Sequence, residues 1–516
     1  MLTRTTLALP LVLALTFSAA GAPTSPPHRI ARPQCSVNCP SSPAGARTWP
    51  RHSPSGGHWR LEAGTSPPRS RSLRAQATRS PLLAGAASIE LEMPAGVPLA
   101  GYGSPARRLF LPDVLGRHPH AFWFKPSRGS RDPIMARALV TEAGAERLLW
   151  VAVDLVAVDA GLVDDVRARA AADGFTYSAV ILSASHTHSG PGAFVDSMLF
   201  GVVATDRFDP GVRRVLLDGI EAAVRHAERG KAPAHVGAGS QTAPALTQSR
   251  LDLPLDPQIA LVKFVRPDGA PVALVWNYAI HGTTLGPRNL KLSGDVMGAA
   301  SRELERSIGA PALYVNGAVG DVSPGEHGEA AAEEAGARLA EVIGRAWTRV
   351  QARDGGALSV SHARVELEAP FVSMRNCLGR WVPGFLTVPL GAALPRSAEL
   401  VAVSVGDSAW VTVPGELETR LGQVVKSVGR RHFGVAFVAG LSNGYLGYLL
   451  TPGAYHRTGY IECASLYGEE AGERVAKVAA GLLERLGAKR ATRAPRVAGR
   501  ARISSEPPCC GGSRLC

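Results

Sequence analysis

The chain has 516 residues, of which 45% are hydrophobic and 19% are charged, a balance that supplies a large core and excludes an intrinsically disordered protein. Its formal net charge of +13 comes from the two ends, because residues 1–85 hold 10 arginines against one acid and residues 488–516 hold 7 basic residues against one acid. The segment between them has 39 basic and 41 acidic residues, so a nucleic-acid groove is excluded and no nucleic-acid partner is expected.

The N-terminus has the features of an export signal. Arg4 precedes an apolar segment from Leu7 to Phe17, so residues 1–22 are predicted to be the signal peptide of a secreted or periplasmic protein. Residues 23–85 and 488–516 are rich in Pro, Ser, Arg or Gly without periodicity and are predicted to be disordered. One folded domain is therefore expected, over residues 86–487. The basic ends could make peripheral contact with a membrane or simply be solvated, and no obligate protein partner is indicated.

Strands and helices alternate along the central segment. Strands are expected at residues 147–158, 178–183, 258–265 and 273–280 and near Val401, Trp410 and Val435, with an antiparallel edge strand within 353–370. Helices are expected at residues 162–172, 210–229, 298–308, 329–350, 416–428 and 469–486. This alternation predicts an α/β fold, with a layered mixed β-sheet core and flanking helices.

Most cysteines lie outside the expected domain, at positions 35, 39, 509, 510 and 516. The fold is therefore not expected to depend on a disulfide framework. Cys377 and Cys463 remain in the domain, where they either pair in an oxidising compartment or stay as buried thiols. The spacing of Cys35 and Cys39 does not fit a structural zinc site.

Two histidines directly follow one of the expected strands. The apolar run 179–182 leads into Ser185-His186-Thr187-His188-Ser189-Gly190, and alternation along a strand would place both imidazoles on one face. Imidazole is the commonest metal-binding side chain near neutral pH, so His186 and His188 mark a candidate metal site. For so short a motif, hydrogen-bonded core histidines or surface histidines are the alternatives.

Four further strands also end in polar or glycine-rich turns. These turns carry His281, the run Gly320-Asp321-Val322-Ser323-Pro324, the run Pro414-Gly415-Glu416, and Tyr445 with Tyr448. In open α/β sheets, ligands bind beyond the carboxyl ends of the strands. The sequence therefore predicts one converging site at the C-terminal ends of these strands.

The order of these segments resembles the neutral, non-lysosomal ceramidase family. The resemblance rests on the segment around His186, the Gly-Asp-Val-Ser-Pro and Pro-Gly-Glu runs, Asn443-Gly444-Tyr445 and Ser465-Leu466-Tyr467-Gly468. It covers about residues 89–486 and is similar to the family's N-terminal catalytic domain. It implies a Zn²⁺-dependent amidohydrolase that cleaves the N-acyl amide bond of ceramide, or of a related N-acyl lipid, to a fatty acid and an amine. Full-length ceramidases also carry a C-terminal β-sandwich domain, which is not expected after Leu486, so ceramide, another N-acyl lipid and a different amide or ester all stay open as substrates.

The resemblance implies that His186, His281, Glu416 and Tyr448 bind the zinc ion. Histidine nitrogens and carboxylate oxygens are ordinary zinc ligands, and a catalytic site leaves one position for water. Each residue also has a simpler interpretation. His281 could cap a strand end, Glu416 could be a charge favoured at a helix N-terminus, and Tyr448 could be an aromatic side chain that lines a pocket.

Three other residues are predicted to act on the reacting groups. The resemblance places Arg250 at the developing oxyanion, although Gln248-Ser249-Arg250-Leu251 departs from the usual Asn-Arg-Ser-Pro, and a solvated loop arginine is the alternative. His188 is expected to supply a proton or stabilise charge. Ser323 lacks a Gly-x-Ser-x-Gly elbow and is expected to orient substrate or water rather than act as a nucleophile.

Three aspartates are candidates for supporting roles. Asp321 is expected to orient a neighbouring donor or to cap its turn. Asp154 and Asp295 are expected either to contact a metal-binding histidine and so fix its orientation, or to be turn residues that face solvent.

Two other classes of protein remain as alternatives. A metal-dependent amidohydrolase or esterase on a TIM barrel also begins with His-x-His, but it needs two later histidines at strand ends, and only His281 is present here. A non-catalytic secreted lipid-binding protein of the same fold is the second alternative.

Overall fold

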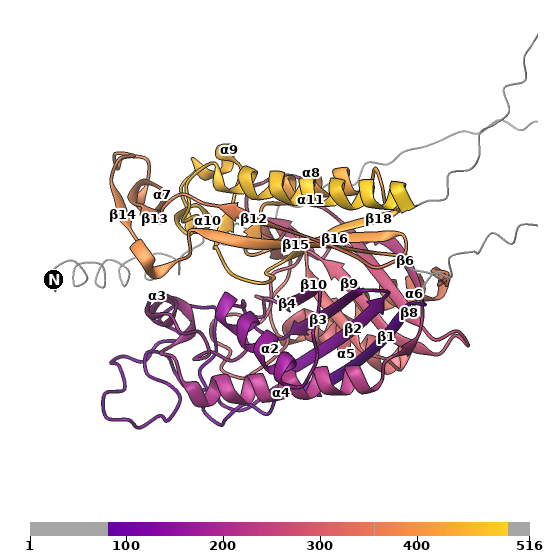
Figure 1. The fold of residues 1–516 in the computed structure, drawn as a ribbon. Coiled ribbons are helices and arrows are strands. Elements are labelled where there is room, and N and C mark those ends of the chain that lie inside the picture. The colour runs from indigo at the N-terminus through magenta and orange to yellow at the C-terminus, as the bar shows by residue number, and fades with distance from the viewer. Residues whose placement is uncertain (1–80, 355–356, 494–516) are drawn as a thin grey trace, which may run out of the picture. The chain divides into compact units, whose positions relative to one another are not determined.

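The computed structural model describes residues 81–354 and 357–493 (Figure 1). The predicted signal peptide and most of the two predicted disordered segments lie outside these residues. Strand β1 (Leu83–Glu90) begins before residue 86, and helix α11 (Ala471–Arg493) continues past residue 487, so ordered elements extend beyond both expected boundaries. Within the described ranges, no helix is both long and apolar enough to cross a membrane.

The first sheet has five strands in the order β4-β3-β2-β1-β5. The other four strands are β2 (Met135–Ala143), β3 (Glu146–Val153), β4 (Ala179–Ala184) and β5 (Ala232–Pro233). Helix α2 (Ala160–Ala172) connects the parallel pair β3 and β4. Helix α4 (Pro210–Arg229) packs on β1 and β2, because its apolar side chains recur at helical spacing from Val212 to Ala227.

The second sheet has four strands in the order β10-β9-β8-β6. Its strands are β6 (His235–Thr242), β8 (Gln258–Val265), β9 (Pro271–Tyr278) and β10 (Ala312–Asn316), and only β9 and β10 are parallel. Helices α5 (Asp295–Ile308) and α6 (Glu329–Arg349) pack against each other and share one apolar cluster with this sheet.

The third sheet has four strands in the order β12-β15-β16-β18. Its strands are β12 (Ser359–Glu366), β15 (Ser397–Val405), β16 (Ser408–Val413) and β18 (Val435–Gly440). Strand β12 forms the antiparallel edge expected within residues 353–370, whereas β16 and β18 are parallel. Helices α8 (Thr419–Gly429) and α11 cover this sheet, at the top of Figure 1.

The three sheets meet in one apolar layer. Trp150 of the first sheet stacks on Trp410 of the third at 4.6 Å between ring centroids, and Phe437 stacks on Trp410 at 5.6 Å. Phe264 and Leu313 of the second sheet belong to the same buried cluster. The helices lie outside these sheets, so the predicted layered α/β fold with mixed sheets is confirmed. The TIM-barrel alternative is wrong, because the described strands form several separate sheets and not a closed parallel barrel.

Several short elements complete the described domain. They are α3 (Met198–Phe200), the π-helix Gly201–Thr205, β7 (Thr247–Ser249), β11 (Val322–Pro324), β13 (Phe371–Ser373), α7 (Met374–Leu378), β14 (Thr387–Pro389), the 3-10 helix Gly391–Ala393, β17 (Glu416–Leu417), β19 (Tyr448–Leu449), α9 (Pro452–Tyr455) and α10 (Tyr460–Cys463). Cys377 and Cys463 form a disulfide that joins α7 to α10, so the paired alternative holds.

One predicted helix boundary is wrong at the place where the site lies. The helix expected to begin at Glu416 begins at Thr419, with Glu418 as its N-cap, and Glu416 lies in strand β17. Strand β17 pairs with β19, so backbone pairing fixes Glu416. A charge at a helix N-terminus is therefore not the explanation for this glutamate.

Candidate functional site

The carboxyl ends of strands from all three sheets lie next to one another. The side-chain amide of Asn316, the last residue of β10, donates to the carbonyls of Ser185, just after β4, and Ile280, just after β9. Thr187 forms a parallel bridge with Gly282, and Ser183 forms an antiparallel bridge with Ser442. These cross-connections bring together segments that are far apart in the sequence, as expected at the ends of α/β strands.

His186 is held by backbone groups of the loop after β3. It has a left-handed φ of 70°, which is uncommon for a residue other than glycine. Its backbone N–H donates to Leu155 O, and its ring Nδ1 lies 2.6 Å from Val156 O. Because a carbonyl only accepts hydrogen bonds, Nδ1 carries a proton, and Nε2 is the ring nitrogen that faces the site.

His281 lies three residues after the end of β9 and is fully buried. A Cβ on its neighbour Gly282 would lie 2.5 Å from His186 O and 2.6 Å from Thr187 Cα. Only glycine fits there, and its absent side chain lets the two histidine-bearing segments run side by side.

Glu416 lies between these two imidazoles. Its Oε2 is 3.0 Å from His281 Nε2 and 3.4 Å from His186 Nε2. Its other oxygen, Oε1, accepts a 2.6 Å hydrogen bond from the hydroxyl of Tyr445. In the register of β17 with β19, Glu416 is paired with Tyr448, whose hydroxyl is 3.5 Å from His281 Nε2.

The unsatisfied atoms at this point fit a bound cation. His186 Nε2 and Glu416 Oε2 are buried without a hydrogen-bond partner and face each other at 3.4 Å. Buried polar groups are normally hydrogen-bonded, and two facing acceptors without a proton repel each other. A metal ion would satisfy both. His186, His188 and His281 also offer ring nitrogens that all lie within 4.8 Å of one another, so three buried histidines could form a metal site.

The surroundings of the site favour a neutral His281 ring and an ionised Glu416 carboxylate, the states that bind a metal, but they also favour the protonated phenol of Tyr448. Burial, with Arg250 and His186 nearby, lowers the pKa of His281 to about 3, so its ring is neutral near pH 7. Burial alone would raise the pKa of Glu416, but the adjacent imidazoles of His186 and His281 hold it well below its usual value. Burial and the Glu416 carboxylate raise the pKa of the Tyr448 phenol, while Arg250 opposes this shift.

His188 lies beside the two other histidines, with ring centroids 4.9 Å from His186 and 5.8 Å from His281. Both of its ring nitrogens are buried without a hydrogen-bond partner. Tyr102 packs edge-on against the ring at 4.8 Å, and a Cβ on Gly101 would lie 2.6 Å from it. Burial, with His186 and His281 nearby, lowers the pKa of His188 well below its usual value, so the ring is a neutral donor or acceptor.

Arg250 and Ser323 form the opposite side of the cluster. Strand β7 pairs with β11, which places Arg250, after β7, next to Ser323. Arg250 donates through Nε to Ser323 Oγ at 2.7 Å and through Nη1 to the Tyr448 hydroxyl at 3.0 Å. Arg250 therefore lies in the cluster and is not a solvated loop arginine. The structure thus brings all seven predicted site residues into one cluster, namely His186, His188, Arg250, His281, Ser323, Glu416 and Tyr448.

The three supporting aspartates differ in their roles. Asp321 accepts from the backbone N–H and hydroxyl of Thr419, both at 2.7 Å, and thereby orients the start of α8 as expected. Neither Asp154 nor Asp295 holds a ligand histidine. Asp154 accepts from Met135 N and faces Arg137 at 3.4 Å, while Asp295 accepts from Leu285 N. The carbonyl of Val156 makes the contact with a histidine ring that was predicted for these aspartates.

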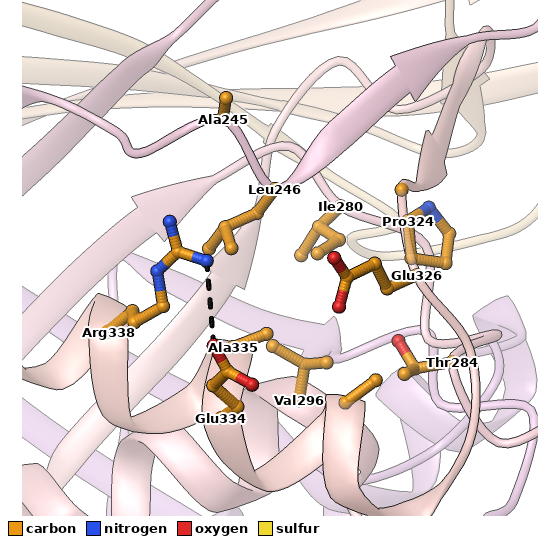
Figure 2. A pocket seen from close by; sticks show the side chains of 12 residues that line it. Ala245, Leu246, Ile280, Thr284, Val296, Pro324, Glu326, Glu334, Ala335 and Arg338 are labelled. Atoms are coloured by element: carbon orange, nitrogen blue, oxygen red, sulfur yellow. Dashed lines mark ion pairs between the residues drawn. The ribbon is translucent and has the colours of Figure 1, made fainter. Parts of the chain in front are cut away.

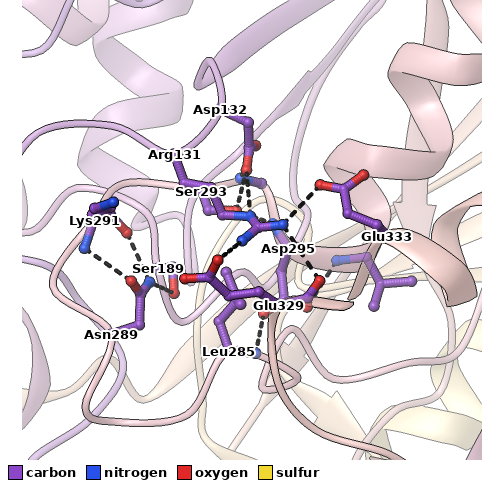
Figure 3. Close-up of polar contacts among 12 residues, drawn as sticks. Arg131, Asp132, Ser189, Leu285, Asn289, Lys291, Ser293, Asp295, Glu329 and Glu333 are labelled. Atoms are coloured by element: carbon purple, nitrogen blue, oxygen red, sulfur yellow. Dashed lines mark hydrogen bonds and ion pairs between the residues drawn. The ribbon is translucent and has the colours of Figure 1, made fainter. Parts of the chain in front are cut away.

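The loop before α5 makes polar contacts with the segment that carries the histidines, and Figure 3 shows its contact with Ser189. Asn289 donates to the hydroxyl of Ser189, and the Thr187 hydroxyl donates to Ser293 O at 2.7 Å. Arg131 lies between Glu329 and Glu333 and pairs with both. These hydrogen bonds fix Thr187 and Ser189, the two neighbours of His188.

A small cavity lies behind the strand ends. Leu246, Ile280 and Val296 line its apolar side, and Glu334 pairs with Arg338 at 3.9 Å on its rim (Figure 2). None of the seven predicted site residues lines this cavity, so it is separate from the cluster.

Sequence reasoning missed three residues that touch the cluster. Tyr102 contacts the ring of His188, and Arg107 donates to Pro287 O and His188 O. Tyr460 packs against Tyr448 at 5.9 Å between ring centroids. The run Gly101-Tyr102-Gly103 was the only available signal, since paired glycines mark a close backbone approach; nothing in the sequence marked Tyr460.

The fold and this cluster define a mixed α/β protein with a buried group of histidine, glutamate and tyrosine side chains that fits a metal ion. Residues 124–341 match the model of the family described as neutral/alkaline non-lysosomal ceramidase, N-terminal. The match confirms the resemblance to this family that the sequence motifs indicated.

Known proteins extend this likeness. The chain is 28% identical over 232 residues to the neutral ceramidase of Mycobacterium tuberculosis, covering 39% of this chain and 36% of that protein. It is 27% identical over 186 residues to the neutral ceramidase of Oryza sativa, covering 32% of this chain and 23% of that protein. The matched segments thus span about a third or less of these relatives.

Solved structures show the same fold. The crystal structure of neutral ceramidase from Pseudomonas aeruginosa superimposes with a TM-score of 0.66 at 19% identity, covering 80% of this chain and 75% of that one. A structure described as ceramidase complexed with C2 superimposes with the same TM-score of 0.66, covering 76% of its chain.

Proposed function

We propose that this chain is a zinc-dependent amidohydrolase that cleaves the N-acyl amide bond of ceramide or a related N-acyl lipid. The observation that carries the proposal is the buried Glu416 carboxylate, which faces the Nε2 of His186 and the Nε2 of His281. The names of the relatives, all neutral ceramidases, support the substrate class. The same cluster would also suit an ester, so the substrate class needs its own test.

In this proposal His186, His281, Glu416 and Tyr448 hold the metal. Two neutral imidazoles and a carboxylate form a common zinc-binding set, and phenolate is a rarer fourth ligand. When bound, zinc polarises a carbonyl and makes a water nucleophilic near neutral pH. Tyr445 orients the Glu416 carboxylate by its hydrogen bond to Oε1, as supporting residues do around metal ligands.

The remaining side chains act on the substrate. The guanidinium of Arg250, fixed by Ser323 and Tyr448, presents a positive charge to the oxygen that becomes negative when the amide carbonyl is attacked. His188 has two unpartnered ring nitrogens and can pass a proton to the leaving amine. Ser323 holds Arg250 and offers its hydroxyl to substrate or water.

Export also belongs to the proposal, with residues 1–22 as its signal. The Cys377–Cys463 disulfide supports it, because disulfides persist in oxidising compartments such as the periplasm or the extracellular space. N-terminal sequencing of the mature protein tests it, and a mature chain that still begins at Met1 would refute it.

A substrate panel tests the activity. Purified protein is stripped with a chelator, reloaded with zinc and assayed on a fluorescent short-chain ceramide, other N-acyl amines, simple esters and peptides. We expect zinc-dependent hydrolysis of the N-acyl amides. Hydrolysis of esters or peptides alone would refute the lipid-amidase assignment, and zinc binding without any turnover would favour a non-catalytic lipid-binding protein.

A further inference from the structure

Exposed apolar side chains gather on two segments of the described domain. The loop 109–118 exposes Phe110 fully, and Leu111, Val114 and Leu115 by 70 to 78%. The segment 374–387, which includes the turn between β13 and β14, exposes Trp381 by 79% and Phe385 by 81%, with Leu378 and Leu386 partly exposed. Of the 12 large hydrophobic side chains exposed in the described residues, 8 lie on these two segments. Such clustering marks an interaction surface.

Both segments are anchored to the candidate site. The loop follows Tyr102, which packs on His188, and Arg107, which donates to His188 O at 3.1 Å. The hairpin segment is tied through the Cys377–Cys463 disulfide to α10, where Tyr460 packs on Tyr448. Tyr460 is 54% exposed, so it lies where the site meets solvent.

Another exposed apolar side chain lies between the two segments. Met198, in α3, is 69% exposed, and its neighbour Phe200 packs edge-on against Tyr445 at 5.6 Å. In Figure 1 the β13–β14 hairpin, α3 and the indigo loops near the N-terminal end of the described chain all project at the same end of the domain. We call the exposed apolar side chains of loop 109–118, Met198 and segment 374–387 the docking face.

The two main segments of the docking face carry a net positive charge, while the exposed acid Asp196 lies near Met198. Segment 374–394 contains Arg375 and Arg380, both exposed, and no acidic residue. Loop 109–118 contains Arg117 and one acid, Asp113, whose carboxylate accepts from the backbone N–H of His118. Protruding aromatic and aliphatic side chains beside arginines suit the interface of an anionic bilayer, where aromatic rings sit at headgroup level and basic groups meet lipid phosphates.

We propose that the docking face inserts into the surface of an anionic phospholipid bilayer and thereby lets a membrane-embedded N-acyl lipid reach the site past Tyr460. This inference rests on the proposed function for the choice of lipid, but not for the binding itself. Two separate projecting tips favour a fluid lipid surface over a protein partner, because an apolar tip needs only to enter the lipid and not to meet a matching surface.

Vesicle sedimentation tests the proposal with the full chain. The protein is mixed with vesicles of phosphatidylcholine alone, or of phosphatidylcholine with phosphatidylserine. The parent protein should bind the anionic vesicles more tightly, and high salt should weaken this binding. The pair Trp381→Ser with Phe385→Ser, and the pair Phe110→Ser with Leu115→Ser, should each weaken binding at least about tenfold, since each pair removes two side chains that would be buried in lipid. The matched control is Val424→Ser, which removes an apolar side chain that is 53% exposed on α8.

Three binding results would each refute the proposed docking face. They are no binding of the parent protein to either vesicle, parent-like binding by both paired variants, and an equal loss in the Val424→Ser control. Self-association of the parent that the paired variants abolish would also overturn it, because the face would then join two copies of the chain. Failure of the proposed function is separable, since it would leave vesicle binding intact while a water-soluble short-chain N-acyl substrate is not hydrolysed.

Discussion

Glu416 and Tyr448 are direct register partners in the two-residue parallel pair of β17 and β19. This pairing connects the segments that follow β16 and β18. It places the Glu416 carboxylate and the Tyr448 phenol next to the same imidazole, that of His281. Backbone pairing, and not a helix terminus, therefore sets the geometry on this side of the cluster.

The first prediction concerns the metal ligands. His186→Ala and His281→Ala should each lose bound zinc while the chain remains folded, because each removes one ligand nitrogen from a site built on backbone pairing. Elemental analysis gives the zinc content, and circular dichroism checks the fold. Full zinc occupancy in a folded variant would show that the ligand assignment is wrong.

The second prediction separates the ligands from the residues that act on substrate. His188→Ala and Arg250→Ala should keep their zinc and lose about 100- to 1000-fold in kcat, the usual effect of removing a transition-state donor. Steady-state kinetics on a short-chain ceramide measures the loss. If the His188 variant lost its zinc, the three-histidine set of His186, His188 and His281 would replace the proposed ligands.

The third prediction concerns Tyr445. Tyr445→Phe removes only the hydroxyl that donates to Glu416 Oε1, and such supporting contacts typically change metal affinity about 10- to 100-fold. Zinc affinity measured by competition with a chelator should fall by this factor. Tyr467→Phe is the control, because its hydroxyl donates to Pro395 O, away from the cluster. Equal zinc affinities in the two variants would contradict the role of Tyr445.

The fourth prediction is a pH dependence of the metal-free protein. The pKa of His281 is lowered from 6.5 to about 3 by folding, so between these pH values the unfolded chain binds a proton that the folded chain does not. Stability should therefore fall as the pH drops through this window and should be fully present above about 6.5. His281→Gln should make the slope shallower by up to about 1.4 kcal/mol per pH unit. Chemical denaturation at several pH values measures both slopes, and identical slopes would refute the prediction.

The fifth prediction concerns the disulfide. Replacing both Cys377 and Cys463 with serine opens a link between residues 86 positions apart, which should lower the free energy of unfolding by about 2–4 kcal/mol. Denaturant unfolding of the oxidised parent and the variant gives the difference. A parent protein that shows two free thiols under native, non-reducing conditions would contradict the disulfide itself.

The sequence predicted the fold class well because its strands and helices are strongly patterned. The buried strand at 179–184 and the amphipathic helix at 210–229 each show their period clearly. The start of α8 was misplaced because Pro414-Gly415 resembles a helix opening, whereas a long-range pairing with Tyr448 holds Glu416 extended. Local patterns carry no information on such pairings.

The candidate site was also largely predictable, because its residues follow strand ends in an order that the family shares. The residues that only touch the site were not. Tyr102 and Tyr460 reach it through loops whose paths depend on tertiary packing, and Val156 holds His186 through a backbone carbonyl that any residue would provide. Sequence alone does not mark a backbone acceptor.

The central claim, a catalytic zinc held by His186, His281, Glu416 and Tyr448, is tested most directly by titrating the chelator-stripped protein with zinc while measuring hydrolysis of a fluorescent short-chain ceramide. Activity should be absent without metal, should rise with added zinc and should level off at one zinc ion per chain. Full hydrolysis by the metal-free protein, or no hydrolysis of any N-acyl amide at saturating zinc, would contradict the account.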